Sequence, residues 1–303
     1  MTVFGPHPLL SITIERRGES DDDIHIHAGG QGVWVARMAG ELGADPVLCA
    51  FCGGETGELL VPLLEALDGE LRCVHTAAAS GCYVVDRRSG KRELIAHAWS
   101  DPPSRHEIDD LFSATCAAAL ESAVLVVCGA LPQDALPLEL YGKLVTNARA
   151  HGTNVVVDLG APRLQAALEG KPDLVKVDEW QLAEFMSGPV SEPEQLRAGA
   201  ERILALGARS VVVTRGGEPA LFLDDGCAWE LVPPRFEGGA SEGSGDSMVG
   251  GLAAARALGL EWHEALRVGA AAGATNFLRH GLGSGHRETV ERLVWRVELR
   301  AAG

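Results

Sequence analysis

Residues 238–251 read GGASEGSGDSMVGG, a glycine-rich stretch that turns directly into a long apolar segment. Gly243, Ser244 and Gly245 carry little side chain, so their backbone N–H groups can approach a ligand closely. Apolar residues recur at helical spacing over 246–258, and the N-terminus of a helix attracts anions. The stretch therefore predicts a helix that begins at an anion site suited to a phosphate group.

Asp246 stands beside this anion site and has two interpretations. A carboxylate there opposes phosphate binding, but it can accept a proton from an attacking hydroxyl group. Asp is also among the best N-cap residues, so a capping role is the simpler interpretation. The stretch is not a P-loop, because no Lys follows its glycines, and not a dinucleotide fingerprint, because Met248 takes the place of the third glycine. The motif by itself leaves both interpretations open.

The composition of the 303-residue chain argues against several classes of protein. Its 26 basic and 42 acidic side chains give a net charge of −16, so we expect neither nucleic acid nor an anionic membrane as a partner. The chain has neither an apolar run of about 18 residues nor the basic and apolar regions of a signal peptide. We therefore expect a cytoplasmic protein.

Two pairs of side chains have the spacing of metal or redox sites. Cys49 and Cys52 form a CxxC, but it lies inside a strand pattern, so we expect both thiols in the core. His25 and His27 share one face of a predicted strand, a spacing that is open to a metal. No third ligand is evident in the sequence near them, and we favour a solvated or lid face.

The order of the elements predicts one α/β domain over residues 1–303. Short strands within 8–28 and a hairpin at 81–99 are expected to form a small lid sheet apart from the core. From residue 124 onward apolar strands alternate with helices, as in a parallel sheet covered on both faces, whose ligands lie beyond the carboxyl ends of the strands. Strands are predicted at 46–51, 71–75, 124–128, 154–158, 174–177 and 210–214, and helices at 57–67, 136–150, 164–168, 179–186, 194–206, 246–258, 262–278 and 287–299.

Four motifs in sequential order resemble those of the ribokinase family, also called PfkB carbohydrate kinases. Residues 28–60, AGGQGVWVARMAGELGADPVLCAFCGGETGELL, are similar to the family's N-terminal GGKGxNxA signature. CGALP at 128–132 resembles an SGSLP loop, LVKVD at 174–178 resembles LxKPN, and GSGDSMVGGL at 243–252 resembles GAGDSMVAG. These forms are typical of the 1-phosphofructokinase and tagatose-6-phosphate kinase branch. The resemblance extends over nearly the whole chain and favours the catalytic interpretation of Asp246.

The resemblance implies a ribokinase-like three-layer α/β/α core with a mostly parallel sheet and a small β-sheet lid. It also implies transfer of a phosphoryl group from ATP, with Mg²⁺, to a sugar hydroxymethyl group, and a homodimer formed through the lid. Asp246 would be the base, and the N–H groups of Gly243, Ser244 and Gly245 would hold the transferring group. The implied nucleotide side comprises Lys176, Thr214, Gly216, Gly217 and Asn276, with Asp178 at the metal, and the implied sugar side comprises Ser11, Gly29, Gly30, Gln31, Trp34 and Tyr83.

The departures from the family pattern gather on the sugar side. Gln31 replaces the Lys of GGKG, Trp34 replaces its Asn, and Ser11 replaces the Asp of an early NPAxD motif. The lid motif TRxNxK reads SGCYVV at 80–85 and so lacks its Arg, Asn and Lys. Each lost charge-assisted hydrogen bond costs about 1.5 to 3 kcal/mol. We therefore expect a phosphorylated sugar such as fructose 6-phosphate to bind poorly.

Two further details bear on this expectation. Arg87, Arg88, Lys91 and Arg92 at the hairpin tip would restore the lost charge if they turned inward, but a solvated tip is the plainer interpretation. On the nucleotide side the family's NxxE appears as an Asp and a Gln, at 178 and 181, which predicts weaker metal binding.

The sequence leaves two hypotheses about function. The first is an active kinase whose small-molecule acceptor has changed, for instance to a sugar without phosphate. The second is a catalytically weak relative that binds a nucleotide or metabolite. The intact Asp246 and its glycine loop favour the first, whereas Gln31, Ser11 and the indole of Trp34, which could fill the sugar pocket, favour the second. An open pocket beside Trp34 would favour the active kinase over the weak relative.

Overall fold

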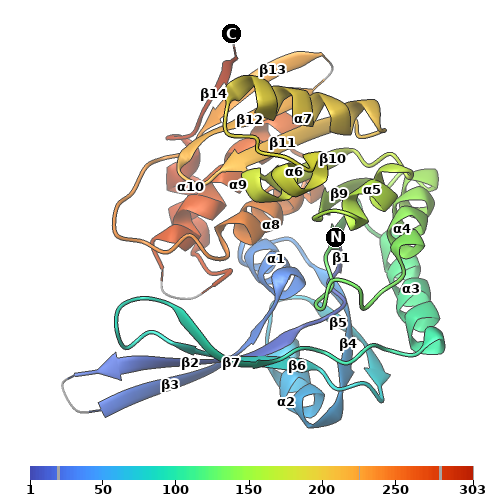
Figure 1. Cartoon of the computed structure of the whole chain (residues 1–303), viewed down its shortest axis with the longest axis vertical. Coiled ribbons are helices and arrows are strands. Elements are labelled where there is room, and N and C mark those ends of the chain that lie inside the picture. The colour runs from blue at the N-terminus through green and yellow to red at the C-terminus, as the bar shows by residue number, and fades with distance from the viewer. Residues whose placement is uncertain (19–20, 225, 280–281, 303) are drawn as a thin grey trace.

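The computed structural model describes residues 1–18, 21–224, 226–279 and 282–302 (Figure 1). Within these residues the strands form two sheets, one of ten strands and one of four. No helix in the described part of the chain is both long enough and apolar enough to cross a membrane. The mixed α/β fold predicted from the sequence is confirmed.

The larger sheet is parallel over most of its width. Its described strands follow the order β14-β13-β12-β11-β10-β9-β8-β1-β4-β5, and the neighbours from β11 to β5 are parallel. The strands at the other edge are antiparallel. The strand bounds are β1 Thr2–Phe4, β4 Val47–Gly53, β5 Glu70–Thr76, β8 Val124–Cys128, β9 Asn154–Asp158, β10 Leu174–Asp178, β11 Ser210–Arg215, β12 Glu218–Asp224, β13 Cys227–Val232 and β14 Glu298–Ala301.

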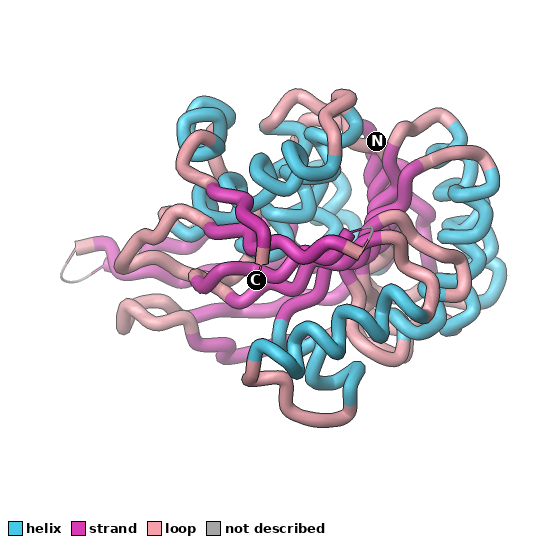
Figure 2. Tube along the Cα trace, turned by 90° about the horizontal axis from the view of Figure 1, so that it is seen from above, coloured by secondary structure: helices cyan, strands magenta, loops and turns pink. Residues whose placement is uncertain are grey.

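Helices cover both faces of this sheet (Figure 2). Successive strand residues face opposite layers, so that Val155 and Val157 of β9 pack into one apolar cluster and Val156 packs into the other. One layer holds α1 Gln31–Glu41, α2 Gly54–Glu65, α8 Ser244–Ala257, α9 Trp262–Phe277 and α10 Arg287–Val294, and the other holds α3 Arg105–Leu120, α4 Leu138–Ala150, α5 Arg163–Leu168, α6 Glu179–Met186 and α7 Pro193–Ala205. The three-layer core is therefore as expected.

The smaller sheet extends away from the core near α1 and α2 (Figure 1). It consists, in spatial order, of β3 Asp21–Gly29, β2 Leu9–Arg17, β6 Gly81–Asp86 and β7 Glu93–Ala98. β2 pairs antiparallel with β3 and parallel with β6. Because opposed residues share a face, Ser11 lies beside His27 and Tyr83 on one face, while Ile12 lies beside Ile26 on the other.

Several elements differ from the sequence prediction. Helix α3 was not predicted, although Ser104 and Glu107 form a capping box at its start, which is a readable signal. Strand β1 and the β12–β13 hairpin were not predicted either. The helix predicted at 287–299 ends at Val294 instead, because Leu299 pairs with Leu231 of β13 as part of β14. Cys49 and Cys52 are buried in β4, as expected.

Gly251 lies where α8 packs against α9. A Cβ atom at this position would lie 2.7 Å from the Cβ of Ala272 and 3.2 Å from the Cα of Gly269. We expect Gly251→Ala to lower the free energy of unfolding by about 1 to 3 kcal/mol through overpacking, offset in part by about 1 kcal/mol of helix propensity. Gly188→Ala is the control, since a Cβ there would meet nothing within 4 Å. Equal urea denaturation midpoints for the two variants would contradict this account.

Candidate active site

The glycine loop before α8 is held from behind by one buried amide. Gly243 is the N-cap of α8 and has a φ of 75°, a left-handed conformation that favours glycine. The Nδ2 of Asn276 donates to the backbone O of Glu242 at 2.8 Å and to the Oγ of Ser244 at 3.2 Å. Its Oδ1 accepts from the N–H of Ser284 at 3.2 Å. Asn276, expected on the nucleotide side, thus fixes the shape of the loop and does not line the larger cavity.

Two of the three expected N–H donors are available at this loop. The N–H of Ser244 donates to the O of Ser241 at 3.1 Å, so it is already used. No hydrogen bond within the described residues uses the N–H of Gly243 or Gly245. Both lie at the positive end of the α8 dipole, where an anion is stabilised.

Asp246 lies in the first turn of α8, after the N-cap residue Gly243. The capping interpretation of Asp246 is therefore wrong. Burial raises the pKa of its carboxyl group to about 7, and the nearby carboxylate of Asp158 adds to this effect, whereas the ammonium group of Lys176 opposes it. A carboxyl group that titrates near neutral pH is suited to accept a proton during a reaction.

A buried ion pair lies next to Asp246 at the ends of β9 and β10. Lys176 is only 4% exposed, and its Nζ donates to the Oδ2 of Asp158 at 3.1 Å. The Nε2 of Gln181 donates to Oδ1 of the same carboxylate at 3.0 Å. Burial opposes the charge on Lys176, but the carboxylates of Asp158, Asp246 and Asp178 outweigh it and raise its pKa. The ammonium group therefore stays charged beneath the anion loop.

A cavity of about 870 Å³ opens between the ends of β10 and β11 and the start of α8. Its volume is within the range of about 300 to 1,000 Å³ that is common for ligand sites. Pro233, Phe236 and Phe277 contribute apolar side chains to its lining. The predicted residues Lys176, Asp178, Thr214, Gly216, Gly217, Ser244 and Gly245 also line it. A lining that combines apolar side chains with a cation and the glycine loop suits a nucleotide.

Asp178 is a limited metal ligand. Its Oδ1 accepts the N–H of Gln181 at 2.8 Å, which closes a capping box at the start of α6. The described residues contain no group of three or more His, Cys, Asp or Glu side chains that could hold a metal ion. Mg²⁺ is commonly held by one or two carboxylates together with phosphates and water. Asp178 at the cavity wall fits that mode, in which the nucleotide supplies the remaining ligands.

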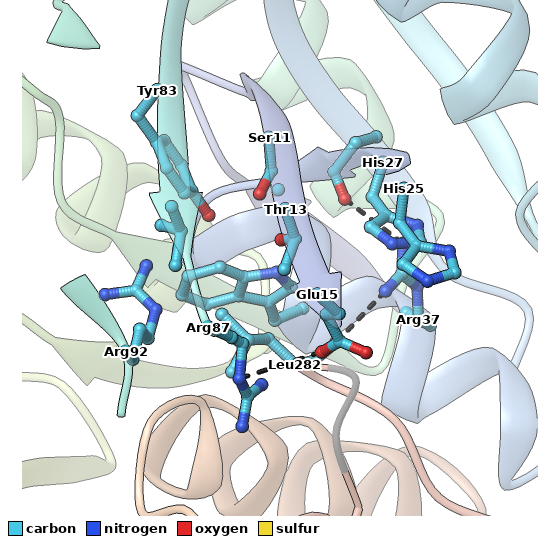
Figure 3. A pocket seen from close by; sticks show the side chains of 14 residues that line it. Ser11, Thr13, Glu15, His25, His27, Arg37, Tyr83, Arg87, Arg92 and Leu282 are labelled. Carbon is cyan, nitrogen blue, oxygen red and sulfur yellow. Dashed lines mark hydrogen bonds and ion pairs between the residues drawn. The ribbon is translucent and has the colours of Figure 1, made fainter. Parts of the chain in front are cut away.

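A smaller cavity of about 310 Å³ lies against the inner face of the four-stranded sheet (Figure 3). The predicted sugar-side residues Ser11, Gly29, Trp34 and Tyr83 line it, and the indole of Trp34 leaves it open. Gly30 does not line it and serves as the N-cap of α1.

Gln31 is placed differently from the sequence expectation. Its Oε1 accepts from the N–H of Gly129 at 2.8 Å, and its Nε2 donates to the backbone O of Asp158 at 3.2 Å. It does not line the smaller cavity. The side chain thus joins the start of α1 to the carboxyl ends of β8 and β9.

The smaller cavity also contains arginines that the sequence analysis did not place there. Arg37 donates to the backbone oxygens of Leu282 and Ala28 at 3.0 and 3.1 Å. Arg92 lies over the ring of Tyr83, with 5.7 Å between its Cζ and the ring centroid. The Nε of Arg87 is 3.7 Å from a carboxylate oxygen of Glu15.

The predicted solvated hairpin tip is therefore wrong for Arg87 and Arg92, both of which line the cavity. It is right for Lys91 and Arg88, which are exposed. Arg88 also pairs with Asp86 and Asp22. The alternation of side chains from Tyr83 through Val85 could have placed Arg87 on the inner face.

The geometry first defines a class of protein. A nucleotide-sized cavity lies at the carboxyl ends of parallel strands and meets a helix N-terminus with available N–H groups. A carboxyl group with a pKa of about 7 lies in the first turn of that helix. These are the parts of a phosphotransferase that acts on small molecules.

The comparisons with known proteins agree with this class. Residues 11–289 match the family described as pfkB family carbohydrate kinase. ATP-dependent 6-phosphofructokinase isozyme 2 of Escherichia coli strain K12 is 31% identical over 260 residues, 84% of this chain and 82% of that protein. 1-Phosphofructokinase of Vibrio cholerae is 25% identical and covers 91% of this chain and 87% of its own length. A structure of Escherichia coli phosphofructokinase-2 in complex with potassium superposes with a TM-score of 0.86 at 26% identity, over 98% of each chain.

The chain thus belongs to the pfkB family of carbohydrate kinases, phosphotransferases that use an alcohol group as acceptor. The resemblance stated from the sequence is confirmed.

Because the pKa of Asp246 is raised, we expect the free energy of unfolding to depend on pH. The folded chain holds this proton up to about pH 7, whereas the unfolded chain releases it near the ordinary value of 3.8, so stability is lost as pH rises from about 4 to about 7 and falls no further above that. Asn carries no charge, so we expect Asp246→Asn to melt at a higher temperature than the unchanged chain at pH 8, by a smaller margin at pH 5, and at the same temperature below about pH 4. Asp109→Asn, at an exposed position of α3, is the control. Identical melting curves for Asp246→Asn and the unchanged chain at pH 8 would contradict the assignment.

Proposed function

We propose that this kinase transfers the γ-phosphoryl group of Mg·ATP to a hydroxymethyl group of a sugar. The observation that carries the proposal is Asp246, whose pKa of about 7 suits a base, in the first turn of the helix whose loop borders the larger cavity. In this proposal the larger cavity takes ATP and the smaller cavity takes the acceptor.

The residues present account for each part of the reaction. The acceptor oxygen forms a bond to the γ-phosphorus, the acceptor proton passes to the carboxylate of Asp246, and the bond to the bridging oxygen breaks to release ADP. The N–H groups of Gly243 and Gly245 and the ammonium group of Lys176 stabilise the phosphoryl charge, where one donor is worth about 3 to 4 kcal/mol. Mg²⁺, held by Asp178 and the phosphates, would neutralise charge that develops on the phosphate oxygens.

The acceptor that the cavity favours carries an anionic group. The sequence alone favoured a sugar without phosphate, because the expected lid cations are absent. Arg37, Arg87 and Arg92 bring three guanidinium groups to the smaller cavity, against the carboxylate of Glu15 (Figure 3). Guanidinium groups are well suited to bind phosphate. We therefore include phosphorylated sugars, the substrates named for the relatives, in the proposed acceptor class.

The alternative is a catalytically weak protein that binds nucleotide or metabolite. Gln31 supports it, because this side chain is used within the fold and does not face the acceptor cavity. The open cavity beside Trp34 argues against it, because an acceptor would not be blocked by the indole.

Asp246→Asn separates the two functions. We expect ADP release from Mg·ATP that depends on one acceptor from a panel of sugars, sugar phosphates, polyols and nucleosides. Loss of a positioned base should lower kcat by about 100-fold to 10,000-fold in the Asn variant. Glu264→Gln, in the first turn of α9, is the matched control and should keep full activity. ATP binding without turnover on any acceptor would support the alternative.

We also propose that the chain forms a homodimer through the outer face of the four-stranded sheet. Ile24 and Ile26 on β3 are 61% and 55% exposed. Ile14 and Ile12 lie directly opposite them on β2, so the four side chains form one apolar surface. A contiguous exposed apolar patch of this kind is typical of an interaction site.

Ile26→Glu tests the dimer. A buried charge at the interface should convert the dimer into a monomer, as measured by light scattering after gel filtration. Leu59→Glu, at an exposed position of α2, is the control and should stay dimeric. A monomeric unchanged chain, or a dimeric Ile26→Glu, would refute the proposed interface.

The cysteines support a cytoplasmic location, which we propose for this kinase. All seven are free thiols, including the neighbouring Cys52 and Cys73. Thiols stay reduced in the cytoplasm, whereas they tend to pair in secreted proteins.

A further inference from the structure

Two histidines line the smaller cavity and belong to none of the motifs that carry the family resemblance. His25 and His27 follow one another on the inner face of β3, with 5.9 Å between the ring centroids and an angle of 13° between the ring planes (Figure 3). Such stacking places both imidazoles along one wall of the cavity. The sequence expectation was a solvated or lid face, and the two histidines do lie on the four-stranded sheet, where they also line the cavity.

Charged groups from β3 itself and from three other elements surround this pair. On β3 itself, the Oδ2 of Asp23 lies 3.6 Å from the Nε2 of His25. Glu15 comes from β2 and Arg37 comes from α1, while Arg87 and Arg92 come from the β6–β7 hairpin. The hydroxyl of Tyr83, a residue only 5% exposed, has no hydrogen-bond partner within the described residues. The cavity thus presents a buried hydroxyl group that no group of the described residues hydrogen-bonds, and a ligand could bind it.

The surroundings oppose protonation of His27 when no ligand is bound. Burial lowers the pKa of His27, the guanidinium group of Arg37 and the ring of His25 lower it further, and the carboxylate of Glu15 opposes them. An anion in the cavity would supply the negative charge that a protonated imidazole requires. A protonated imidazole would in turn offer the anion a second N–H donor.

We propose that His25 and His27 bind the anionic group of the acceptor, and that a proton is taken up at His27 when it binds. The inference rests on the proposed role of the smaller cavity as the acceptor site, and it assigns these two residues to acceptor specificity. Because binding and protonation favour each other, the affinity for the acceptor increases as the pH falls.

Calorimetry of the full chain with fructose 6-phosphate and fructose 1-phosphate tests the proposal without requiring turnover. Titrations at pH 7.0 in two buffers of different ionisation enthalpy report the protons taken up. Near this pH the phosphate group is already largely dianionic, since its second pKa is about 6, and its own contribution would be a release. We expect net uptake for at least one of the two ligands.

The variant His25→Gln/His27→Gln carries the decisive comparison. We expect the double variant to take up no proton when the ligand binds. We also expect the ratio of its Kd to that of the unchanged chain to rise from about 1 at pH 8.5 to about 10 at pH 5.5. At each pH the ligand has the same ionisation state for both chains, so its own titration does not affect the ratio of the two Kd values. His97→Gln is the control, because His97 lies on the same sheet, contacts the ring of Trp99 and does not line the cavity.

A second measurement uses the unchanged chain. The NMR titration of the His27 imidazole should move to higher pH when the ligand is saturating. Uptake retained in the double variant, a Kd ratio that does not change with pH, or no binding of either sugar phosphate between pH 5.5 and 8.5 would overturn the proposal. Binding with proton uptake but without phosphoryl transfer would instead refute the kinase function and leave the histidine site standing.

Discussion

The ion pair between Lys176 and Asp158 is the interaction on which the rest of the site depends. Removing two charges from water costs several kcal/mol per ion, so such a pair persists only when further hydrogen bonds satisfy it. Gln181 supplies one to the Asp158 carboxylate, and Gln31 binds the backbone of the same residue. A Cβ on Gly245 would lie 3.0 Å from the Nζ of Lys176, so the first turn of α8 rests directly on the pair. The pair therefore sets both the position of the anion loop and the charge around Asp246.

The two halves of the site have diverged from the family pattern to different degrees. On the nucleotide side the predicted residues line one cavity, and only Asn276 serves another purpose, as the support of the loop. On the acceptor side the motif residues are replaced, and Gln31 has become a structural link between helix and sheet. Arg37, from within the first motif stretch, and Arg87 and Arg92, from outside the motifs, line the cavity instead. A charged side chain can reach the acceptor from a different backbone position, whereas the groups that act in phosphoryl transfer must keep their positions relative to one another.

The four-stranded sheet has two faces with different chemistry because side chains alternate along its strands. Its inner face presents hydroxyl, imidazole, guanidinium and carboxylate groups to the smaller cavity. Its outer face presents isoleucines to solvent. A rotation or twist of these strands would change both faces together. The proposed dimer surface and the proposed acceptor site therefore share the backbone of β2 and β3.

The sequence by itself determined the parallel α/β core, the glycine loop before α8 and the importance of Asp246, because apolar periodicity and loop chemistry act within a few residues. It did not reveal that Gln31 reaches Asp158, 127 residues away, or that Arg37 binds the backbone of Leu282, 245 residues away. It also placed Arg87 and Arg92 in solvent. These contacts depend on which strands pair and in what register, and pairing is decided by the packing of the whole chain. Only the tertiary structure could therefore show which side chains form the acceptor cavity.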